Sequence, residues 1–311
     1  MNPERIKALE RQGYRLAGKH SAVKVCLWTK KALRDEGACY KHRFYGIQSH
    51  RCVQMSPVLD LCNHACLFCW RDIKYMDRKL GFAVDEPHEI IDRCIEKQKE
   101  FLQGFKGNPK TSQKKFDEAM QPKHFAISLT GEPTFYKKLP EFVETLNDRR
   151  LTSFIVSNGT NPLMIEKLAD AEPTQLYITL PSPDEKLYAR TCKPLLKDGW
   201  KKLLQSLSLM HLFNRSVVRL TLVKGLNLVK PEKYSEIIRK AEPDFVECKA
   251  FMPLGYSRER LPFDAMPSHK QIADFAIELN NGLDYYLLDE DPVSRVVLLS
   301  KHKRKKLIKI K

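Results

Sequence analysis

The amino-acid sequence predicts an α/β fold: a partial (β/α)6 barrel with an N-terminal extension and a C-terminal β hairpin. From about residue 53, short apolar runs alternate with segments of helical periodicity, which gives six strand–helix units. Within several runs, polar and apolar residues alternate with the two-residue period of a barrel strand. Six units are fewer than the eight of a closed barrel, so the barrel is expected to be partial.

The predicted elements follow one another in regular order. Strands are expected at 53–59, 125–129, 153–156, 176–180, 217–223 and 245–251. Helices are expected at 86–105, 139–147, 162–169, 199–212, 231–241 and 268–280. Residues 1–50 are expected to form an extension of short helices and loops, and 51–284 the core. Residues 285–311 are expected to form a basic hairpin and tail, with strands at 293–299 and 307–310.

Three of the predicted strands carry polar residues at every second position. These residues are Tyr177, Thr179, Arg219, Thr221, Glu247 and Lys249. The apolar face should pack on the outer helices, which leaves the polar face inside the barrel. The sequence therefore predicts an open, solvated lumen that binds a polar molecule, unless one strand has its two faces exchanged.

Composition and charge narrow the class of protein. The chain has no apolar run near 18 residues and no apolar signal-peptide core, so we expect a cytoplasmic protein without a membrane partner. Its nine cysteines are then more often metal ligands than disulfides. The formal charge of +16 favours a nucleic-acid partner, although a Lys-rich surface gives the same excess. Seven Lys or Arg residues in 301–311 either contact phosphates or form a solvated tail.

The first candidate site is the loop Cys62-Asn-His-Ala-Cys66-Leu-Phe-Cys69-Trp70. Three cysteines within eight residues can bind one inorganic group from a single loop. Three thiolates are one fewer than a closed tetrahedral zinc site or a fully ligated cubane cluster requires, which would leave one metal position open for chemistry. The alternative is a zinc knuckle that borrows a histidine or a fourth cysteine.

A second set of cysteines precedes this loop. Cys26, Cys39 and Cys52 have twelve residues between each pair, so they must come from three separate loops. Beside the first loop they indicate another cluster with three protein ligands, and the alternative is three unrelated thiols. A fully extended strand at 53–59 would span roughly 23 Å. Either that strand bends at Pro57 or the second cluster lies down inside the lumen.

Further polar residues lie where predicted strands end, which is the position of the active site in barrel enzymes. Thr130-Gly131-Glu132-Pro133 and Ser157-Asn158-Gly159 follow two strands, and Thr179 and Arg219 face the same lumen. Glycine lets the backbone approach a ligand closely, and a carboxylate can pair with an ammonium group. Each feature alone is an ordinary turn or strand end, but their shared position at one mouth indicates a binding site.

The Cys62–Trp70 loop, with an aromatic residue before its last cysteine, resembles the cluster loop of the radical S-adenosylmethionine (SAM) enzymes. The Thr130–Pro133 turn resembles their Gly-Gly-Glu motif, with Thr130 in place of the first glycine. The resemblance implies a barrel of the radical SAM type, a [4Fe–4S] cluster on Cys62, Cys66 and Cys69, and a 5′-deoxyadenosyl radical made from SAM. The SAM contacts that we expect are Trp70, Glu132, Ser157, Asn158, Thr179 and Arg219.

A wider resemblance, from about Tyr14 to the C-terminal hairpin, is to the tRNA 4-demethylwyosine synthases. It is carried by both cysteine sets and by segments 39–47, 49–52, 105–107, 129–133, 174–177 and 219–224. It implies that carbons of pyruvate are joined to the 1-methylguanosine beside the anticodon of tRNA(Phe), which closes a third ring. Eukaryotic relatives carry a flavodoxin-like reductase domain that this sequence lacks, so a separate electron-donor protein is expected. A monomer is also expected.

The same resemblance implies roles for the N-terminal region. A second [4Fe–4S] cluster on Cys26, Cys39 and Cys52 would bind the carboxylate and carbonyl of pyruvate. Lys41 is placed to form a Schiff base with pyruvate, and a phosphate contact is the alternative. Phe44, Tyr45 or other aromatic residues of this region would hold the guanine outside its stack.

Two other functions stay open from the sequence alone. One is a different radical SAM enzyme that modifies RNA, such as a methyltransferase, which would need a methyl-carrying cysteine rather than a second three-cysteine set. The other is a zinc-stabilised RNA-binding protein without catalysis. A brown protein with iron would favour the enzymes, and a colourless protein with zinc would favour the binding module.

Overall fold

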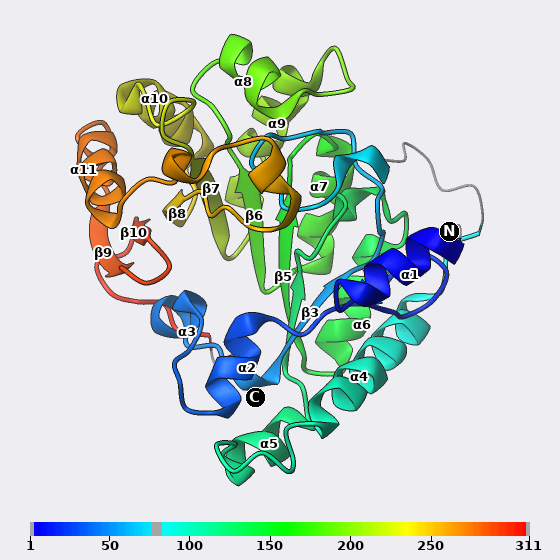
Figure 1. Cartoon of the computed structure of the whole chain (residues 1–311). Coiled ribbons are helices and arrows are strands. Elements are labelled where there is room, and N and C mark those ends of the chain that lie inside the picture. Colours follow the sequence, from blue (N-terminus) through cyan, green and yellow to red (C-terminus); the bar gives the residue numbers. More distant parts are fainter. Residues whose placement is uncertain (1–2, 76–82, 309–311) are drawn as a thin grey trace.

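The computed structural model describes residues 3–75 and 83–308, and it is built on one mixed sheet in the order β1-β2-β3-β4-β5-β6-β7-β8-β10-β9 (Figure 1). The six central strands pair in parallel. They are β3 (Cys52–Ser56), β4 (His124–Ile127), β5 (Thr152–Ser157), β6 (Gln175–Thr179), β7 (Ser216–Leu222) and β8 (Phe245–Ala250). The sheet does not close, and the predicted partial barrel is confirmed.

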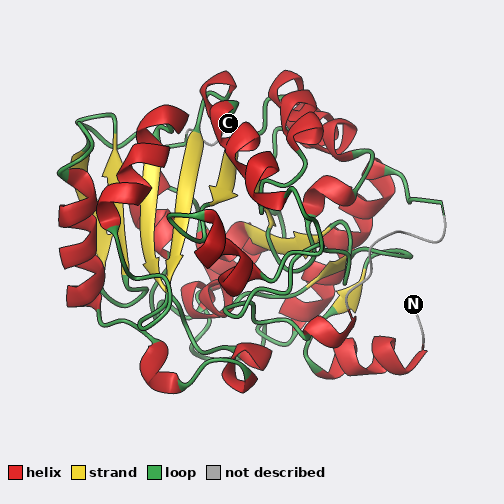
Figure 2. Cartoon of the chain, turned by 90° about the horizontal axis from the view of Figure 1, so that it is seen from above, coloured by secondary structure: helices red, strands yellow, loops and turns green. Residues whose placement is uncertain are grey.

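Helices cover the outer face of this sheet (Figure 2). They are α4 (Pro87–Gln103), α6 (Leu139–Asp148), α7 (Pro162–Ala171), α8 (Glu185–Cys192), α9 (Gly199–Ser208), α10 (Pro231–Ala241) and α11 (His269–Asn280). Four of them have proline in the first turn, where no backbone N–H is needed for the helix. The apolar strand residues that face outward form one large core with the helices, as the alternation predicts. Among the described residues, no helix is both long and apolar enough to cross a bilayer.

The inner face of the sheet is closed by α3 (Tyr40–Tyr45) from the N-terminal region. Glu247, on β8, accepts hydrogen bonds from the hydroxyls of Tyr40 at 2.9 Å and Tyr45 at 2.8 Å. Its carboxylate also pairs with Arg219, on β7, at 2.9 Å, and Glu247 has no exposed surface. The polar face therefore points inward as predicted. The expectation of an open, solvated lumen is wrong here, because α3 fills this part.

The packing of α3 also overturns one expectation about the aromatic residues. Phe44 and Tyr45 were expected to hold a guanine base, but they are 1% and 0% exposed. Both rings pack edge-on against neighbouring aromatic rings in the inner core. A base that stacked on them would have to displace that core, so these two residues are structural.

The rest of the N-terminal region lies across the first edge of the barrel. It comprises α1 (Pro3–Arg11), β1 (Arg15–Leu16), β2 (Ala22–Val23) and α2 (Leu27–Leu33). β2 pairs antiparallel with β3, which ends at Ser56, before Pro57. A short helix without a sequence prediction, α5 (Gln113–Ala119), packs its apolar side against α2 through Leu33 and Phe116.

The C-terminal hairpin is present, but its strands differ from the expected pair. β9 (Tyr286–Asp291) and β10 (Val296–Ser300) pair antiparallel, and β10 also pairs with β8. The expected strand at 293–299 corresponds to β10, whereas its partner precedes it in the chain. Residues 307–308 are not a strand, and 309–311 lie outside the described residues. The sequence did not predict β9 because its residues, YLLDED, are half acidic, and Asp and Glu are depleted in strands.

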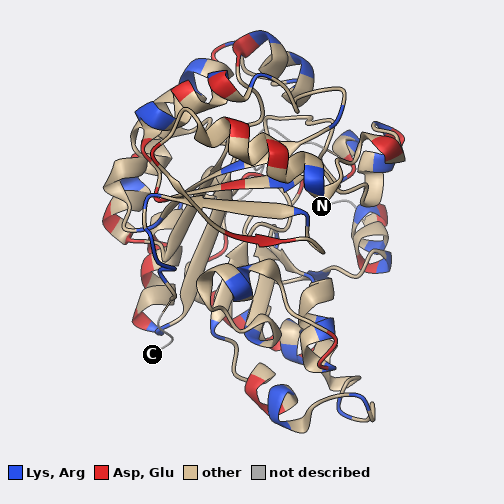
Figure 3. Ribbon diagram, turned by 90° about the vertical axis from the view of Figure 1, so that its left-hand side faces the viewer, with Lys and Arg blue, Asp and Glu red and all other residues tan. Residues whose placement is uncertain are grey.

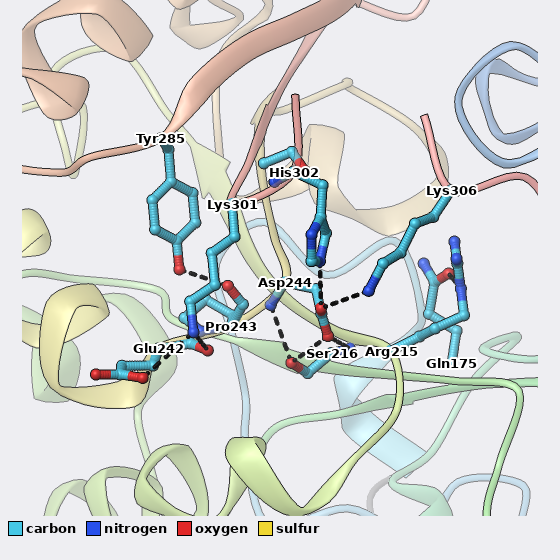
Figure 4. Close-up of polar contacts among 11 residues, drawn as sticks. Gln175, Arg215, Ser216, Glu242, Pro243, Asp244, Tyr285, Lys301, His302 and Lys306 are labelled. Carbon is cyan, nitrogen blue, oxygen red and sulfur yellow. Dashed lines mark hydrogen bonds and ion pairs between the residues drawn. The ribbon is translucent and has the colours of Figure 1, made fainter. Parts of the chain in front are cut away.

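The basic residues after β10 are partly held by acidic groups (Figure 4). Asp244 accepts hydrogen bonds from His302 at 2.8 Å and Lys306 at 3.4 Å, and Lys301 donates to the Glu242 carbonyl at 2.6 Å. These contacts fasten the C-terminal segment across the start of β8. Elsewhere, Lys and Arg are spread over many elements (Figure 3), so the positive charge is not confined to the tail.

The buried carboxylate of Glu247 gives a test of this architecture. Glu247→Gln removes the charge that compensates Arg219 in the interior, so it should lower the free energy of unfolding by about 3–5 kcal/mol. Urea unfolding followed by circular dichroism measures the change. The control Glu236→Gln, on the exposed face of α10, should shift stability by no more than about 0.5 kcal/mol. Equal stability of the two variants would contradict this role.

Candidate active site

The Cys62–Trp70 loop follows β3 and is held on one side by the C-terminal end of α8 and the residues that follow it. Backbone amides of Ala65 and Leu67 donate to the carbonyls of Cys192 and Thr191, each at 2.9 Å. The amide of Leu195 returns a bond of 2.9 Å to Asn63. On the other side, Arg260 donates to the carbonyls of Leu67 and Cys69. The loop therefore has a defined shape from protein contacts alone.

The thiols of this loop line a cavity of about 290 Å³, and their pKa values are shifted. Burial raises the pKa of Cys62 to about 12 and also raises that of Cys69. The guanidinium of Arg71 opposes this rise at both cysteines, and it forms a hydrogen bond with Cys69. Arg71 was missed in the sequence, although its position two residues after Cys69 was a possible signal.

A fourth thiol lies beside the loop. Cys192, to which the sequence assigned no role, is hydrogen-bonded to Cys66, and this contact together with burial raises the pKa of Cys66. Ligand atoms of His64, Cys66 and Cys192 all lie within 4.8 Å of one another. Over residues 3–75 and 83–308, neither predicted cysteine set is gathered as tightly. The group of His64, Cys66 and Cys192 is the arrangement that the zinc alternative would use.

The turn after β4 is clamped to the start of the cysteine loop. Gly131 has φ of +72°, and a Cβ there would lie 2.0 Å from the carbonyl oxygen of Val58. The amide of Glu132 donates to the Leu61 carbonyl at 2.7 Å. Only glycine permits this approach, which explains why the Gly–Glu pair occurs next to the cysteines.

The Glu132 carboxylate is fully buried at the cavity wall and is held by neighbours. It accepts hydrogen bonds of 2.7 Å from the Ser157 hydroxyl and from the amide of Asn158, and two more from Thr134. Burial raises the pKa of Glu132, and these hydrogen bonds oppose the rise. The side chain of Asn158 reaches Asn63 at 2.8 Å. Hydrogen bonds thus connect the carboxyl ends of β4 and β5 to the cysteine loop.

One cavity unites nine residues that were predicted separately. It is the 290 Å³ cavity above, and its walls include Cys62, Cys66, Cys69, Trp70, Glu132, Ser157, Asn158, Thr179 and Arg219. The ring of Trp70 stacks on Tyr14, with centroids 6.1 Å apart. Arg219 lines the cavity while its guanidinium is paired with Glu247. The carboxyl ends of four strands therefore meet at the cysteine loop.

The second cysteine set is assembled from three elements around one lysine. Cys26 and Cys39 are the N-cap residues of α2 and α3, and Cys52 begins β3. Burial is the main cause of the raised pKa of Cys39 and Cys52; Cys26 adds to the rise at Cys39, and both Cys26 and Cys39 add to the rise at Cys52. Lys41 influences the ionisation of all three. These residues form a group distinct from the first loop.

Lys41 lies above two aromatic rings, with Nζ 4.3 Å from the centroid of Tyr177 and 5.0 Å from that of Phe154. Burial and the positive charge of nearby Arg219 lower the pKa of Lys41 to about 8. A second lumen lysine, Lys249, also has its pKa lowered to about 8 by burial. Its Nζ donates to the Ser294 carbonyl at 2.7 Å. The sequence placed Lys249 inside the barrel without giving it a role.

Two family models match the chain. The radical SAM superfamily covers residues 56–238, and wyosine base formation covers 240–301. The chain is 48% identical to the S-adenosyl-L-methionine-dependent tRNA 4-demethylwyosine synthase of Pyrococcus abyssi, over 96% of this chain and 89% of the relative. It is 38% identical to that of Methanocaldococcus jannaschii, over 98% of each chain. It is 36% identical to the human TYW1 enzyme, over 98% of this chain and 42% of the relative.

Solved structures agree with these matches. A structure of TYW1 with a lysine-pyruvate adduct bound superimposes with a TM-score of 0.89 at 35% identity, over 99% of both chains. A crystal structure of archaeal TYW1 gives 0.81 at 32% identity, over 99% of this chain and 100% of that one. The chain therefore belongs to the S-adenosyl-L-methionine-dependent tRNA 4-demethylwyosine synthases, radical SAM enzymes that modify tRNA with the help of SAM and a [4Fe–4S] cluster.

Proposed function

We propose that this chain joins carbons of pyruvate to the 1-methylguanosine beside the anticodon of tRNA(Phe) and so forms 4-demethylwyosine. The observation that carries the proposal is the presence of two separate three-cysteine sets in one barrel, the second grouped around a buried lysine. A methyltransferase has no need of the second set. The radical SAM methyltransferase of Sphaerobacter thermophilus is 16% identical with a TM-score of 0.55, so it shares the fold alone.

In this proposal Cys62, Cys66 and Cys69 hold the SAM cluster. A [4Fe–4S] cluster held there would supply the electron for reductive cleavage of SAM, and removal of a hydrogen atom from the methyl group of the guanine would follow. The protein's part is to hold SAM and to exclude water. The residues assigned to SAM are the other cavity residues predicted above: Trp70, Glu132, Ser157, Asn158, Thr179 and Arg219. Glu132 is the one carboxylate among them, and it is suited to the SAM ammonium.

We propose that Cys26, Cys39 and Cys52 hold a second [4Fe–4S] cluster and that pyruvate binds next to it. Three half-buried thiols from three elements, none of them in a disulfide, fit such a group. Three cationic side chains, Lys41, Arg219 and Lys249, surround one carboxylate, Glu247, in this part of the lumen, and this excess of positive charge suits a small anion. The N-terminal region, 1–50, would then supply the part of the site that selects pyruvate.

Lys41 is the proposed covalent residue. Its neutral amine would add to the ketone carbon of pyruvate, and loss of water would leave an imine between Nζ and that carbon. Two observations support the assignment: Lys41 lies within two residues of Cys39, and a relative with 35% identity has been solved with a lysine-pyruvate adduct bound. The imine would activate pyruvate for attack by the guanine-borne radical.

The remaining partners are proposed from the chemistry. Each SAM cleavage consumes one electron, and we propose that a separate electron-donor protein delivers it. We further propose that the chain acts as a monomer in the cytoplasm, where its tRNA substrate is found. The net charge of +16 supports binding to the tRNA backbone.

Reduction with borohydride tests the role of Lys41. In cluster-loaded enzyme with pyruvate, borohydride should fix a pyruvate-derived group on the peptide that contains Lys41, and Lys41→Arg should abolish it, because a guanidinium cannot form the imine. Mass spectrometry of the digest provides the measurement. The matched control is Lys249→Arg, which changes the other lumen lysine and should leave trapping intact. Trapping on Lys249 instead would show that Lys41 is not the covalent residue.

Iron content tests the two cysteine sets. Wild-type protein reconstituted without oxygen should hold about eight irons per chain, four in each cluster. Cys26→Ala, Cys39→Ala and Cys52→Ala should each lower this to about four and still cleave SAM when reduced by dithionite, but form no tricyclic base. Cys62→Ala should lose SAM cleavage itself. The control Cys94→Ala, in the outer core, should keep all the iron. A colourless, zinc-loaded wild type would refute the proposal.

A further inference from the structure

We infer that the methylated guanine binds in a second cavity, of about 830 Å³, that lies between the two cysteine sets; this inference rests on the function proposed above. The cavity has aromatic, charged and amide side chains in its wall. The residues that the argument uses are Lys24, Trp28, Phe68, Trp70, Tyr256 and Glu259. A cavity of this size is within the usual range for a small-molecule site and can take a nucleoside.

The position of the cavity is the first argument. Phe68 and Trp70 line both this cavity and the cavity of the SAM site, so the two spaces adjoin. Cys26, a member of the second cysteine set, lines the other part of its wall. The guanine must lose a hydrogen atom to one centre and gain carbons at the other. A base in this cavity is next to both.

The aromatic lining is the second argument. Trp28, Phe68, Trp70 and Tyr256 are all half-buried, in contrast to the core rings of Phe44 and Tyr45. In the part of the chain that the structure describes, neither Trp28 nor Tyr256 stacks on another ring. Enzymes that act on a base take it out of its stack and bind it between aromatic side chains. Unstacked rings beside the reaction centres match that requirement.

The charged groups are the third argument, because they complement guanine. Lys24 has its Nζ 5.0 Å from the ring centroid of Trp70, and the carboxylate of Glu259 makes no ion pair with any residue in 3–75 or 83–308. Guanine presents O6 and N7 as acceptors and its N2 amine as a donor. Methylation at N1 removes the other donor of that edge. Lys24 is therefore suited to O6 or N7, and Glu259 to the N2 amine.

The wall that carries Glu259 is fixed to the SAM loop. Gly255 has φ of +53°, and a Cβ there would lie 2.4 Å from the carbonyl oxygen of Trp70. The amide of Tyr256 donates to the same oxygen at 3.0 Å. A base held by Tyr256 and Glu259 is thus positioned by the same loop that holds the SAM cluster, which sets its distance from the radical.

Binding of an anticodon stem-loop RNA to the cluster-loaded enzyme tests the inference. Two RNAs are compared, one with 1-methylguanosine at the target position and one with an abasic site there, so that phosphate contacts are shared and only the base differs. Wild-type enzyme should prefer the methylated RNA. Glu259→Gln and Trp28→Ala should each weaken binding of the methylated RNA about tenfold, through a lost charged hydrogen bond and a lost stack, and leave abasic binding unchanged.

Matched controls are Glu236→Gln and Phe263→Ala, an exposed carboxylate and an exposed ring outside the cavity, which should behave as wild type. Thermal unfolding of every variant checks that the fold is kept. Undiminished preference for the methylated RNA in both Glu259→Gln and Trp28→Ala would overturn the inference, as would the absence of any preference in wild type. Analysis of the wild-type product distinguishes failure of this inference from failure of the proposed function. If wild type forms the tricyclic base but the variants bind the methylated RNA normally, only the assignment of the cavity is refuted. If wild type forms no tricyclic base, the proposed function is refuted.

Discussion

The buried ion pair between Arg219 and Glu247 is the interaction on which the arrangement of this site depends. It connects two adjacent barrel strands, and the hydroxyls of Tyr40 and Tyr45 complete it from α3. A buried pair of charges is costly unless its remaining hydrogen-bonding positions are filled, so the barrel interior favours one placement of α3. Since Cys39 is the N-cap of α3 and Lys41 lies in its first turn, that placement also positions the second cysteine set. An N-terminal segment without a strong periodicity thus acquires a fixed geometry from a charge inside the barrel.

The site is divided between two levels of the barrel. At the mouth, the cysteine loop is tied to the turns after β4 and β5 through Glu132 and Asn158. Lower down, the N-terminal region supplies the thiols and the lysine, and Cys26 reaches the cavity beside Trp70. The reaction proposed here needs two activated partners, a radical and an imine. Building each from a different part of the chain keeps them separate until a base lies between them.

Much of this was predictable from the sequence, for physical reasons that differ between residues. The strands and the nine residues that line the 290 Å³ cavity were predicted because period-two alternation, cysteine spacing and the ends of strands are local signals. The closing of the lumen by Tyr40 and Tyr45 was not predictable, because the residues that meet there are about 200 apart in the chain. Cys192 was missed for the same reason, since only the folded chain brings it to Cys66. The strand β9 was missed because its acidic residues obscure the apolar alternation.

The contacts that hold the cysteine loop determine what happens when one of its cysteines is changed. The segment 191–195, Arg260 and the Gly131 turn hold the loop through backbone hydrogen bonds that involve no thiol. The shape of the loop therefore does not depend on its thiols. Substituting one of its cysteines removes a ligand without removing the contacts that fold the loop.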